Sequence, residues 1–261
     1  MPAGGPYRRV LLKVSGEVFG GHDKNLDVDR LALIADEVQS VHSDGIQLGV
    51  VVGGGNLLRG AEVAAAGMDR VSADHAGMIA TVMNGLALQD ALERRGVETR
   101  VCSAIEMTDV CEPFIRRRAV HHLNKGRVPI LVGGTGNPFF TTDTTAALRA
   151  RELEAEIVLK ATKVDGVYTA DPKLDPTARR IDKIGSMEVL QRRLRVMDST
   201  AIALCQETGI PILVFDLTVP GNVLRAARGE PVGTLIDPSL EPNDVNHAND
   251  PSRESATGGD T

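Results

Sequence analysis

Two lysines lie in or beside apolar runs of this chain, where a charged side chain is unexpected. Lys13 comes near the end of one run and is followed by Val14-Ser15-Gly16, a turn of small residues. Such a turn lets backbone N–H groups approach an anion, and the lysine adds positive charge beside it. An ordinary turn with a surface lysine explains the motif equally well. Lys160 interrupts the run at 157–161, and because burying a charge is costly, we expect it to point into a site.

A glycine-rich segment follows a second apolar run. Gly53-Gly54-Gly55-Asn56 comes directly after residues 50–52. Three glycines are costly in chain entropy, and they favour a loop whose backbone must contact a large anion over a merely flexible turn. Arg59 lies four residues beyond Gly55, where its guanidinium could bind phosphate oxygens with two hydrogen bonds.

A third glycine-rich segment, residues 133–143, again links an apolar run to a helical pattern. Its end, Thr141-Thr142-Asp143, gathers hydroxyls and a carboxylate at the start of the predicted helix, where anions are favoured. Asp143 has two compatible interpretations, as the helix N-cap or as an electrostatic or metal-related group.

Two further side chains are candidates for nucleotide contacts. Asp74 lies in the predicted first turn of a long helix, where it could complement the helix dipole or bind sugar hydroxyls. Tyr168 lies in a turn-rich segment, 163–172, and could lie against a purine ring.

Several common motifs are absent from the sequence. It contains no GxxxxGK[ST] loop, no GxGxxG after the first predicted strand, no HRD or DFG pair, no GxSxG and no HExxH. The histidines and the three cysteines show no metal-ligand spacing, and we expect the cysteines to be reduced thiols in a cytoplasmic protein. We therefore predict no protein-bound metal.

Alternating strand and helix patterns supply the elements that position these residues. Strands are predicted at 9–14, 47–52, 99–103, 128–132, 157–161, 211–215 and 233–236. Helices are predicted at 27–44, 73–95, 116–125, 144–153, 186–193, 199–207 and 222–228. This alternation is typical of an α/β fold with a mostly parallel sheet covered on both faces, which binds ligands at the carboxyl ends of its strands.

Composition narrows the class of protein. Of 261 residues, 42% are hydrophobic and 3% aromatic, which predicts an aliphatic core without stacking platforms for nucleic acid. The net charge is −6, and residues 237–261 carry six acids and one arginine, so the remainder is nearly neutral and no nucleic-acid partner is indicated. No run has membrane-spanning length, and the first residues lack a signal-peptide pattern. We predict a short flexible N-terminus (1–7), one catalytic domain (8–236) and a disordered acidic tail (237–261).

Taken together, five segments resemble the bacterial uridylate kinase (UMP kinase) family of the amino-acid kinase superfamily. They are Lys13-Val-Ser-Gly16, Val51-Val-Gly-Gly-Gly-Asn-Leu-Leu-Arg-Gly60, Asp74-His-Ala-Gly-Met-Ile-Ala-Thr-Val-Met-Asn-Gly-Leu-Ala87, Gly134-Thr-Gly-Asn-Pro-Phe-Phe-Thr-Thr-Asp143 and Leu159-Lys-Ala-Thr-Lys-Val-Asp-Gly-Val-Tyr-Thr-Ala-Asp-Pro172. The run from Gly136 to Asp143 is very specific to this family.

The resemblance implies a three-layer α/β/α sandwich and transfer of the ATP γ-phosphoryl group to UMP with Mg²⁺, in pyrimidine nucleotide biosynthesis. It implies that ATP is bound by Lys13, Val14, Ser15, Gly16, Gly55, Arg59, Thr162, Tyr168 and Asp171. It implies that UMP is bound by Gly54, Asp74, Gly136, Asn137, Pro138, Phe139, Phe140, Thr141, Thr142 and Asp143. It further implies a homohexamer that is activated by GTP and inhibited by UTP.

In this interpretation Lys13, Arg59, Asp143 and Lys160 are the catalytic candidates. Both substrates are anions, so the cationic side chains, glycine-loop amides and Mg²⁺ would offset their repulsion. Two alternatives stay open. One is a superfamily kinase acting on a small acid such as aspartate or acetylglutamate, and the other is an ATP-binding storage or regulatory protein on the same fold.

Overall fold

The computed structural model describes residues 6–21, 24–58, 65, 67–170, 174–175, 177–194, 196–241 and 246–247. Two predicted site residues, Arg59 and Asp171, lie outside the described residues. The same holds for residues 1–5 of the predicted flexible N-terminus and for most of the predicted tail.

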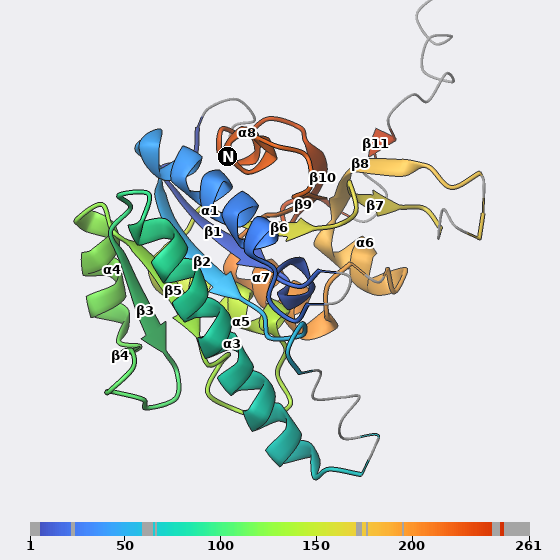
Figure 1. Cartoon of the computed structure of the whole chain (residues 1–261). Coiled ribbons are helices and arrows are strands. Elements are labelled where there is room, and N and C mark those ends of the chain that lie inside the picture. Colours follow the sequence, from blue (N-terminus) through green and yellow to red (C-terminus); the bar gives the residue numbers. More distant parts are fainter. Residues whose placement is uncertain are drawn as a thin grey trace, which may run out of the picture.

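The chain alternates strands with helices (Figure 1). The strands are β1 (Arg9–Val14), β2 (Gln47–Val52), β3 (Thr99–Ser103), β4 (Glu112–Pro113), β5 (Val128–Val132), β6 (Ile157–Thr162), β7 (Val167–Tyr168), β8 (Arg180–Gly185), β9 (Ile212–Asp216), β10 (Gly233–Asp237) and β11 (Asn246–His247). The helices are α1 (Val28–Ser43), α3 (Arg70–Glu93), α4 (Arg116–Asn124), α5 (Thr142–Leu153), α6 (Ser186–Gln191), α7 (Ser199–Thr208) and α8 (Asn222–Ala227), with a 3₁₀ turn, η1, at Gly16–Val18.

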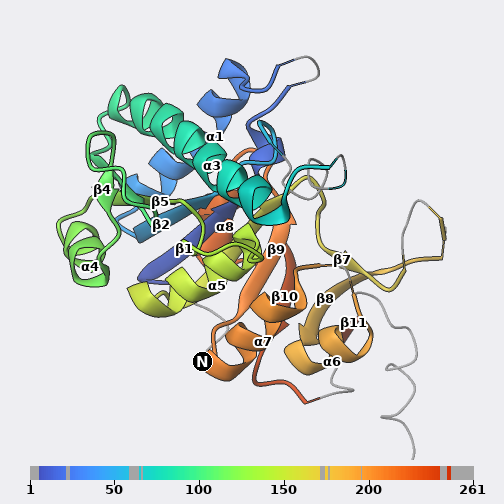
Figure 2. The same ribbon diagram turned by 90° about the horizontal axis from the view of Figure 1, so that it is seen from below.

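One sheet joins the described strands in the order β11-β8-β10-β9-β6-β1-β2-β5-β3-β4, with β7 paired to β8. The central strands from β9 to β4 are parallel, whereas β10 is antiparallel to β9, and β7 and β11 are antiparallel to β8. Figure 2 shows helices on both sides of this sheet, α1 and α3 on one and α5, α6 and α7 on the other. The predicted three-layer α/β/α fold with a mostly parallel sheet is therefore confirmed.

Strand alternation divides the core into two halves. In β1, Val10 and Leu12 pack in the cluster that contains α1, α3 and α8, whereas Leu11 packs in the cluster that contains α4, α5 and α7. The side chains of successive strand residues point to opposite faces. Lys13 therefore shares the face of Leu11, and in β6 Lys160 shares the face of Val158, so both lysines point toward α5.

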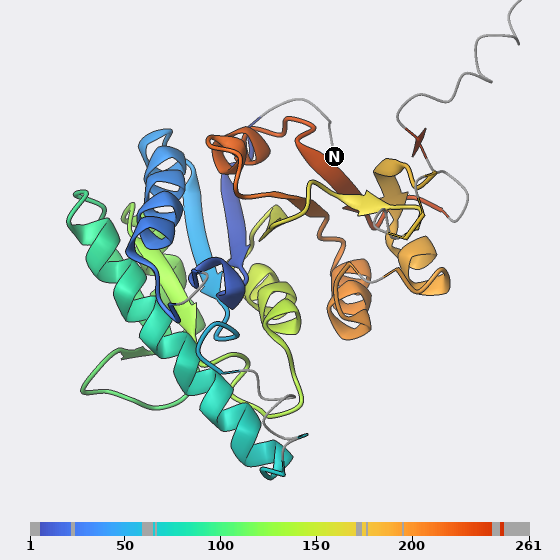
Figure 3. The same ribbon diagram turned by 45° about the vertical axis from the view of Figure 1, so that its right-hand side comes forward.

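The helix boundaries follow local signals. Asp27 caps α1 by accepting hydrogen bonds from the N–H groups of Asp29 and Arg30. Asp69 caps α3 in the same way from Ser72, so α3 begins at Arg70, three residues before the predicted start. The N-terminal turns of α3 extend past the sheet (Figures 1 and 3), and Asp74 is its fifth residue rather than part of its first turn.

Other features of the structure also differ from the sequence prediction. Helix α5 begins at Thr142 and its N-cap is Thr141, so Asp143 is not the cap. Strand β8 was not predicted, because its three charged residues interrupt the alternation that marks a strand. Strand β4 was not predicted either, because it is only two residues long. In the described part of the chain, no helix is both long and apolar enough to cross a membrane.

Candidate active site

The centre of the candidate site is set by strand register. Parallel pairing of β1 with β6 places Lys13 directly opposite Lys160. Both side chains leave the same face of the sheet near the carboxyl ends of these strands, and only 6% of Lys13 and 7% of Lys160 is exposed. Two buried ammonium groups on adjacent strands require a compensating anion.

Asp143, in the first turn of α5, supplies that anion. Its Oδ1 lies 3.0 Å from Lys13 Nζ and its Oδ2 lies 2.7 Å from Lys160 Nζ. Lys13 Nζ also donates to Ser15 Oγ at 2.9 Å, and Lys160 Nζ donates to the carbonyl oxygen of Val196 at 2.5 Å. The cluster therefore carries a formal charge of +1, suited to an incoming anion.

The protonation equilibria of this cluster reflect burial and mutual charge. Burial would raise the pKa of Asp143, but the ammonium groups of Lys13 and Lys160 outweigh burial, and the pKa lies below its ordinary value. Burial lowers the pKa of Lys160, and Asp143 offsets this effect only in part. Asp143 is therefore ionised at neutral pH and fixes both lysines in place.

The start of α5 is held by a residue that the sequence analysis missed. Asp198 caps α7 by accepting from the Ala201 N–H, and it also accepts hydrogen bonds from the hydroxyls of Thr141 and Thr144. This carboxylate thus joins α7 to the first turn of α5 and fixes the position of Asp143. The only signal in the sequence was an Asp before Ser199-Thr200, which is typical of an N-cap.

The loops after β1 and β2 pack directly against each other. A Cβ atom on Gly16 would lie 2.2 Å from the Gly55 nitrogen, and one on Gly53 would lie 2.6 Å from the Gly16 nitrogen. A Cβ on Gly54 would lie 2.7 Å from the Gly77 carbonyl oxygen in α3. Close packing thus accounts for three of these glycines without a ligand. It also brings both loops to the edge of the sheet where β1 ends, one residue after Lys13.

The loop between β5 and α5 approaches α3. Asp74 accepts hydrogen bonds from Phe139 N–H at 2.8 Å and from Arg70 Nε at 2.9 Å. Phe139 has a φ of 70°, a left-handed conformation that is uncommon for an aromatic residue, and its ring lies over the Arg70 guanidinium. The structure therefore brings Asp74 together with the segment Gly136–Asp143, as the shared assignment to one substrate requires.

Two candidates lie at a different part of the sheet edge. Thr162 accepts from Val164 N–H and donates to its carbonyl oxygen, which shapes the turn after β6. The Tyr168 hydroxyl donates a hydrogen bond to Asp165. Burial raises the pKa of Tyr168, and the Asp165 carboxylate raises it to a smaller extent. The described contacts join neither residue to the lysine–aspartate cluster.

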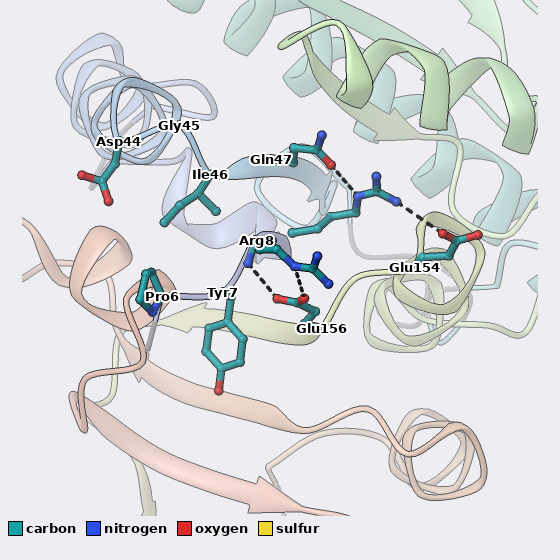
Figure 4. A pocket seen from close by; sticks show the side chains of 10 residues that line it. Pro6, Tyr7, Arg8, Asp44, Gly45, Ile46, Gln47, Glu154 and Glu156 are labelled. Carbon is teal, nitrogen blue, oxygen red and sulfur yellow. Dashed lines mark hydrogen bonds and ion pairs between the residues drawn. The ribbon is translucent and has the colours of Figure 1, made fainter. Parts of the chain in front are cut away.

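A pocket of roughly 570 Å³ lies at the opposite end of the strands, beside the first residues of β1 and β2. Figure 4 shows Arg8 paired with Glu156. Arg9 forms an ion pair with Glu154, and Asp44 forms one with Arg228, which does not line the pocket. None of the predicted site residues lines it. Among the described residues, no three His, Cys, Asp or Glu side chains form a group that could hold a metal ion.

Comparisons with known proteins agree with this geometry. The sequence model of the amino acid kinase family matches residues 8–216. A crystal structure of UMP kinase from Bacillus anthracis is 38% identical, with a TM-score of 0.89 over 94% of this chain and 100% of that chain. UMP kinase from Ureaplasma parvum is 36% identical, with a TM-score of 0.84 over 88% and 99%. Uridylate kinase from Archaeoglobus fulgidus is 31% identical, with a TM-score of 0.68 over 87% and 99%. This chain therefore belongs to the amino acid kinase family.

Proposed function

We propose that this protein is an ATP-dependent UMP kinase, which transfers the γ-phosphoryl group of ATP to UMP. The observation that carries the proposal is the Lys13–Asp143–Lys160 cluster, a buried site of net positive charge between two glycine loops and the start of α5. The likeness to three UMP kinases over 87% or more of this chain supports the choice of acceptor.

The cluster suits this reaction on electrostatic grounds. Phosphoryl transfer between nucleotides passes through a loose transition state, and catalysis comes mainly from positioning and charge stabilisation. The acceptor is already an ionised phosphate, so no strong general base is needed. Lys13 and Lys160 offset repulsion between the two anions, and Asp143 keeps both ammonium groups aimed at one point.

We assign the substrates to the two sides of this cluster. The ATP side comprises Lys13, Val14, Ser15, Gly16, Gly55, Arg59, Thr162, Tyr168 and Asp171. The UMP side comprises Gly54, Asp74 and residues 136–143. The hydrogen bond from Phe139 N–H to Asp74 supports the second group, because it joins two of its separate parts.

Magnesium fits this site as an ion carried by the substrates. Mg²⁺ in kinases is usually bound through one or two carboxylates and the substrate phosphates. Both oxygens of Asp143 lie within 3.0 Å of a lysine nitrogen, which leaves it poorly placed as the centre of a protein cage. When bound to the phosphates, the ion would supply further charge neutralisation.

We further infer a cytoplasmic homohexamer of the pyrimidine nucleotide pathway that GTP activates and UTP inhibits. The family resemblance supports assembly and regulation. Ile79 and Met83, one turn apart on α3, are 47% and 57% exposed, which is consistent with burial in an assembly. The three cysteines are buried and unpaired, as expected for a reducing compartment.

A substrate panel tests the function. ADP formation from ATP and Mg²⁺ is measured with UMP, CMP, aspartate or acetylglutamate as the acceptor, and the product is identified by chromatography. We expect UDP from UMP as the dominant product. Turnover of a small acid alone would assign the chain to a different kinase reaction, and nucleotide binding without turnover would indicate a storage or regulatory protein.

A further inference from the structure

Two buried polar side chains on α3 contact the two glycine loops, and neither belongs to the site described above. Thr81 is 5% exposed and Asn84 is fully buried. They lie three residues apart, so they share one face of the helix. Figure 3 shows α3 running along the sheet and past its edge, where those loops lie.

Thr81 holds the loop that leads to α5. Its hydroxyl donates to the Met78 carbonyl oxygen at 2.6 Å, which leaves its lone pairs free to accept. The Gly133 N–H donates to that oxygen at 2.7 Å. Gly133 has a φ of 75°, and its amide is the first of the loop, so this bond fixes the point at which the chain leaves β5.

Asn84 holds the loop after β2. Its Nδ2 donates to the Gly53 carbonyl oxygen and to Asn56 Oδ1, each at 2.7 Å. Asn56 Nδ2 donates to Asn84 Oδ1 at 3.1 Å and to the Asn25 carbonyl oxygen at 2.5 Å. The first and last residues of the Gly53–Asn56 loop are thus tied to a single buried amide group.

Close packing shows that α3 lies directly against both attachment points. A Cβ on Gly85 would lie 2.5 Å from a methyl group of Val132, the last residue of β5. A Cβ on Gly54 would lie 2.9 Å from Ala80 Cβ. Because α3 approaches both attachment points this closely, the hydrogen bonds of Thr81 and Asn84 can set the spacing between the two loops.

We propose that Thr81 and Asn84 are positioning residues that set the separation of the two substrate loops. Thr81 acts on the loop between β5 and α5, which binds the acceptor, and Asn84 acts on the loop after β2, where the phosphates of the two substrates meet. The proposal rests on the proposed function, which assigns residues 136–143 to UMP and the neighbouring Gly54 and Gly55 to the two different substrates. The two residues should therefore affect different kinetic constants.

Steady-state kinetics separates these roles. Thr81→Val keeps the shape of the side chain but removes the acceptor of the Gly133 N–H, and we expect the KM for UMP to rise about tenfold while the KM for ATP stays within about twofold. Thr81→Ser retains the hydroxyl and should restore the KM for UMP. Asn84→Ala should lower kcat about tenfold with both KM values within about twofold. Asp90→Asn, at an exposed position of α3, is the matched control and should leave all three constants unchanged.

Hydrogen exchange gives a readout that does not depend on turnover. In the folded protein, Thr81→Val should speed amide exchange in the peptide covering residues 128–140, while the peptide covering 212–216 keeps the wild-type rate. If the wild type does not phosphorylate UMP, the proposed function fails, but this local change in exchange still supports the role of Thr81. Equal changes in both KM values for both variants, or faster exchange throughout the chain, would overturn the proposal and show that the two residues only stabilise the fold.

Discussion

Replacing Asp143 with Asn removes an anion that contacts both buried lysines while keeping the size of the side chain. The wild-type contacts are 3.0 and 2.7 Å long, and the side chains involved are 8% to 15% exposed. At an effective dielectric constant of about 20, each contact corresponds to roughly 6 kcal/mol of Coulomb energy, most of which offsets desolvation. Removing one partner of a buried ion pair typically costs about 3–5 kcal/mol. We therefore expect Asp143→Asn to lower the free energy of unfolding by about 3 kcal/mol at neutral pH.

Urea unfolding at several pH values measures this loss and checks its cause. Because the pKa of Asp143 is lowered in the folded state, its stabilisation is present above the ordinary Asp pKa and is lost as the pH falls through the lowered value. The pKa of Lys160 is already lowered by burial and would fall further without Asp143. The deficit of the variant should thus be full near neutral pH and narrow at alkaline pH, below the ordinary Lys value of 10.5, as Lys160 loses its charge.

Thermal unfolding should show the same loss as a decrease in Tm of roughly 10 °C. Asp90→Asn, which removes a surface ion pair with Arg94, should cost less than about 1 kcal/mol at every pH. A deficit for Asp143→Asn below about 1 kcal/mol, or one that stays constant up to the ordinary Lys value of 10.5, would refute the claim that Asp143 neutralises two buried charges.

Three further outcomes can be tested. The alkaline decline of kcat should begin below the ordinary Lys pKa of 10.5, because burial lowers the pKa of Lys160. In Lys160→Arg, the remaining activity should persist to higher pH. A pH–rate profile of both proteins measures this difference. Glu37→Gln should lower the free energy of unfolding by about 1–2 kcal/mol in urea, because the buried carboxylate accepts hydrogen bonds from the Gly221 and Val223 N–H groups at the start of α8; no loss would refute that role. Chelation of Mg²⁺ should abolish turnover while leaving the Tm of the nucleotide-free protein unchanged, and a fall in that Tm would indicate a metal bound by the protein itself.

Most of the fold could be predicted from the sequence, because the strands that form its centre are largely apolar runs, and two of them, β2 and β5, are followed directly by glycines. The same pattern placed Lys13 and Lys160 near the carboxyl ends of two strands, where parallel pairing brings such residues together. The sequence does not state the register, so the direct pairing of Lys13 with Lys160 emerged only from the structure. Strand β8 escaped prediction because its core-facing residues, Ile181 and Ile184, are separated by two charged ones.

The supporting contacts of the site were harder to predict for a different reason. Asp198 lies 55 positions from Asp143 and acts through hydroxyls on another helix, a contact that no local pattern encodes. The glycines after β2 were interpreted as a surface for an anion. The structure shows that Gly53 and Gly54 are already required by close contact with Gly16 and α3. Local composition thus identified the loop, but not which of its neighbours excludes side chains.

Turnover of UMP by the wild type and by Lys13→Ala tests whether the protein is a UMP kinase that depends on the lysine–aspartate cluster. UDP formed from UMP and ATP with Mg²⁺ is quantified under single-turnover and steady-state conditions, and circular dichroism and Tm confirm that the variant is folded. We expect UDP formation by the wild type and a loss of kcat of at least about a thousandfold in Lys13→Ala, because the variant would lack the cation that we propose to act on the transferring group. A folded Lys13→Ala protein with near-normal turnover would contradict the account and remove the lysine–aspartate cluster from the mechanism.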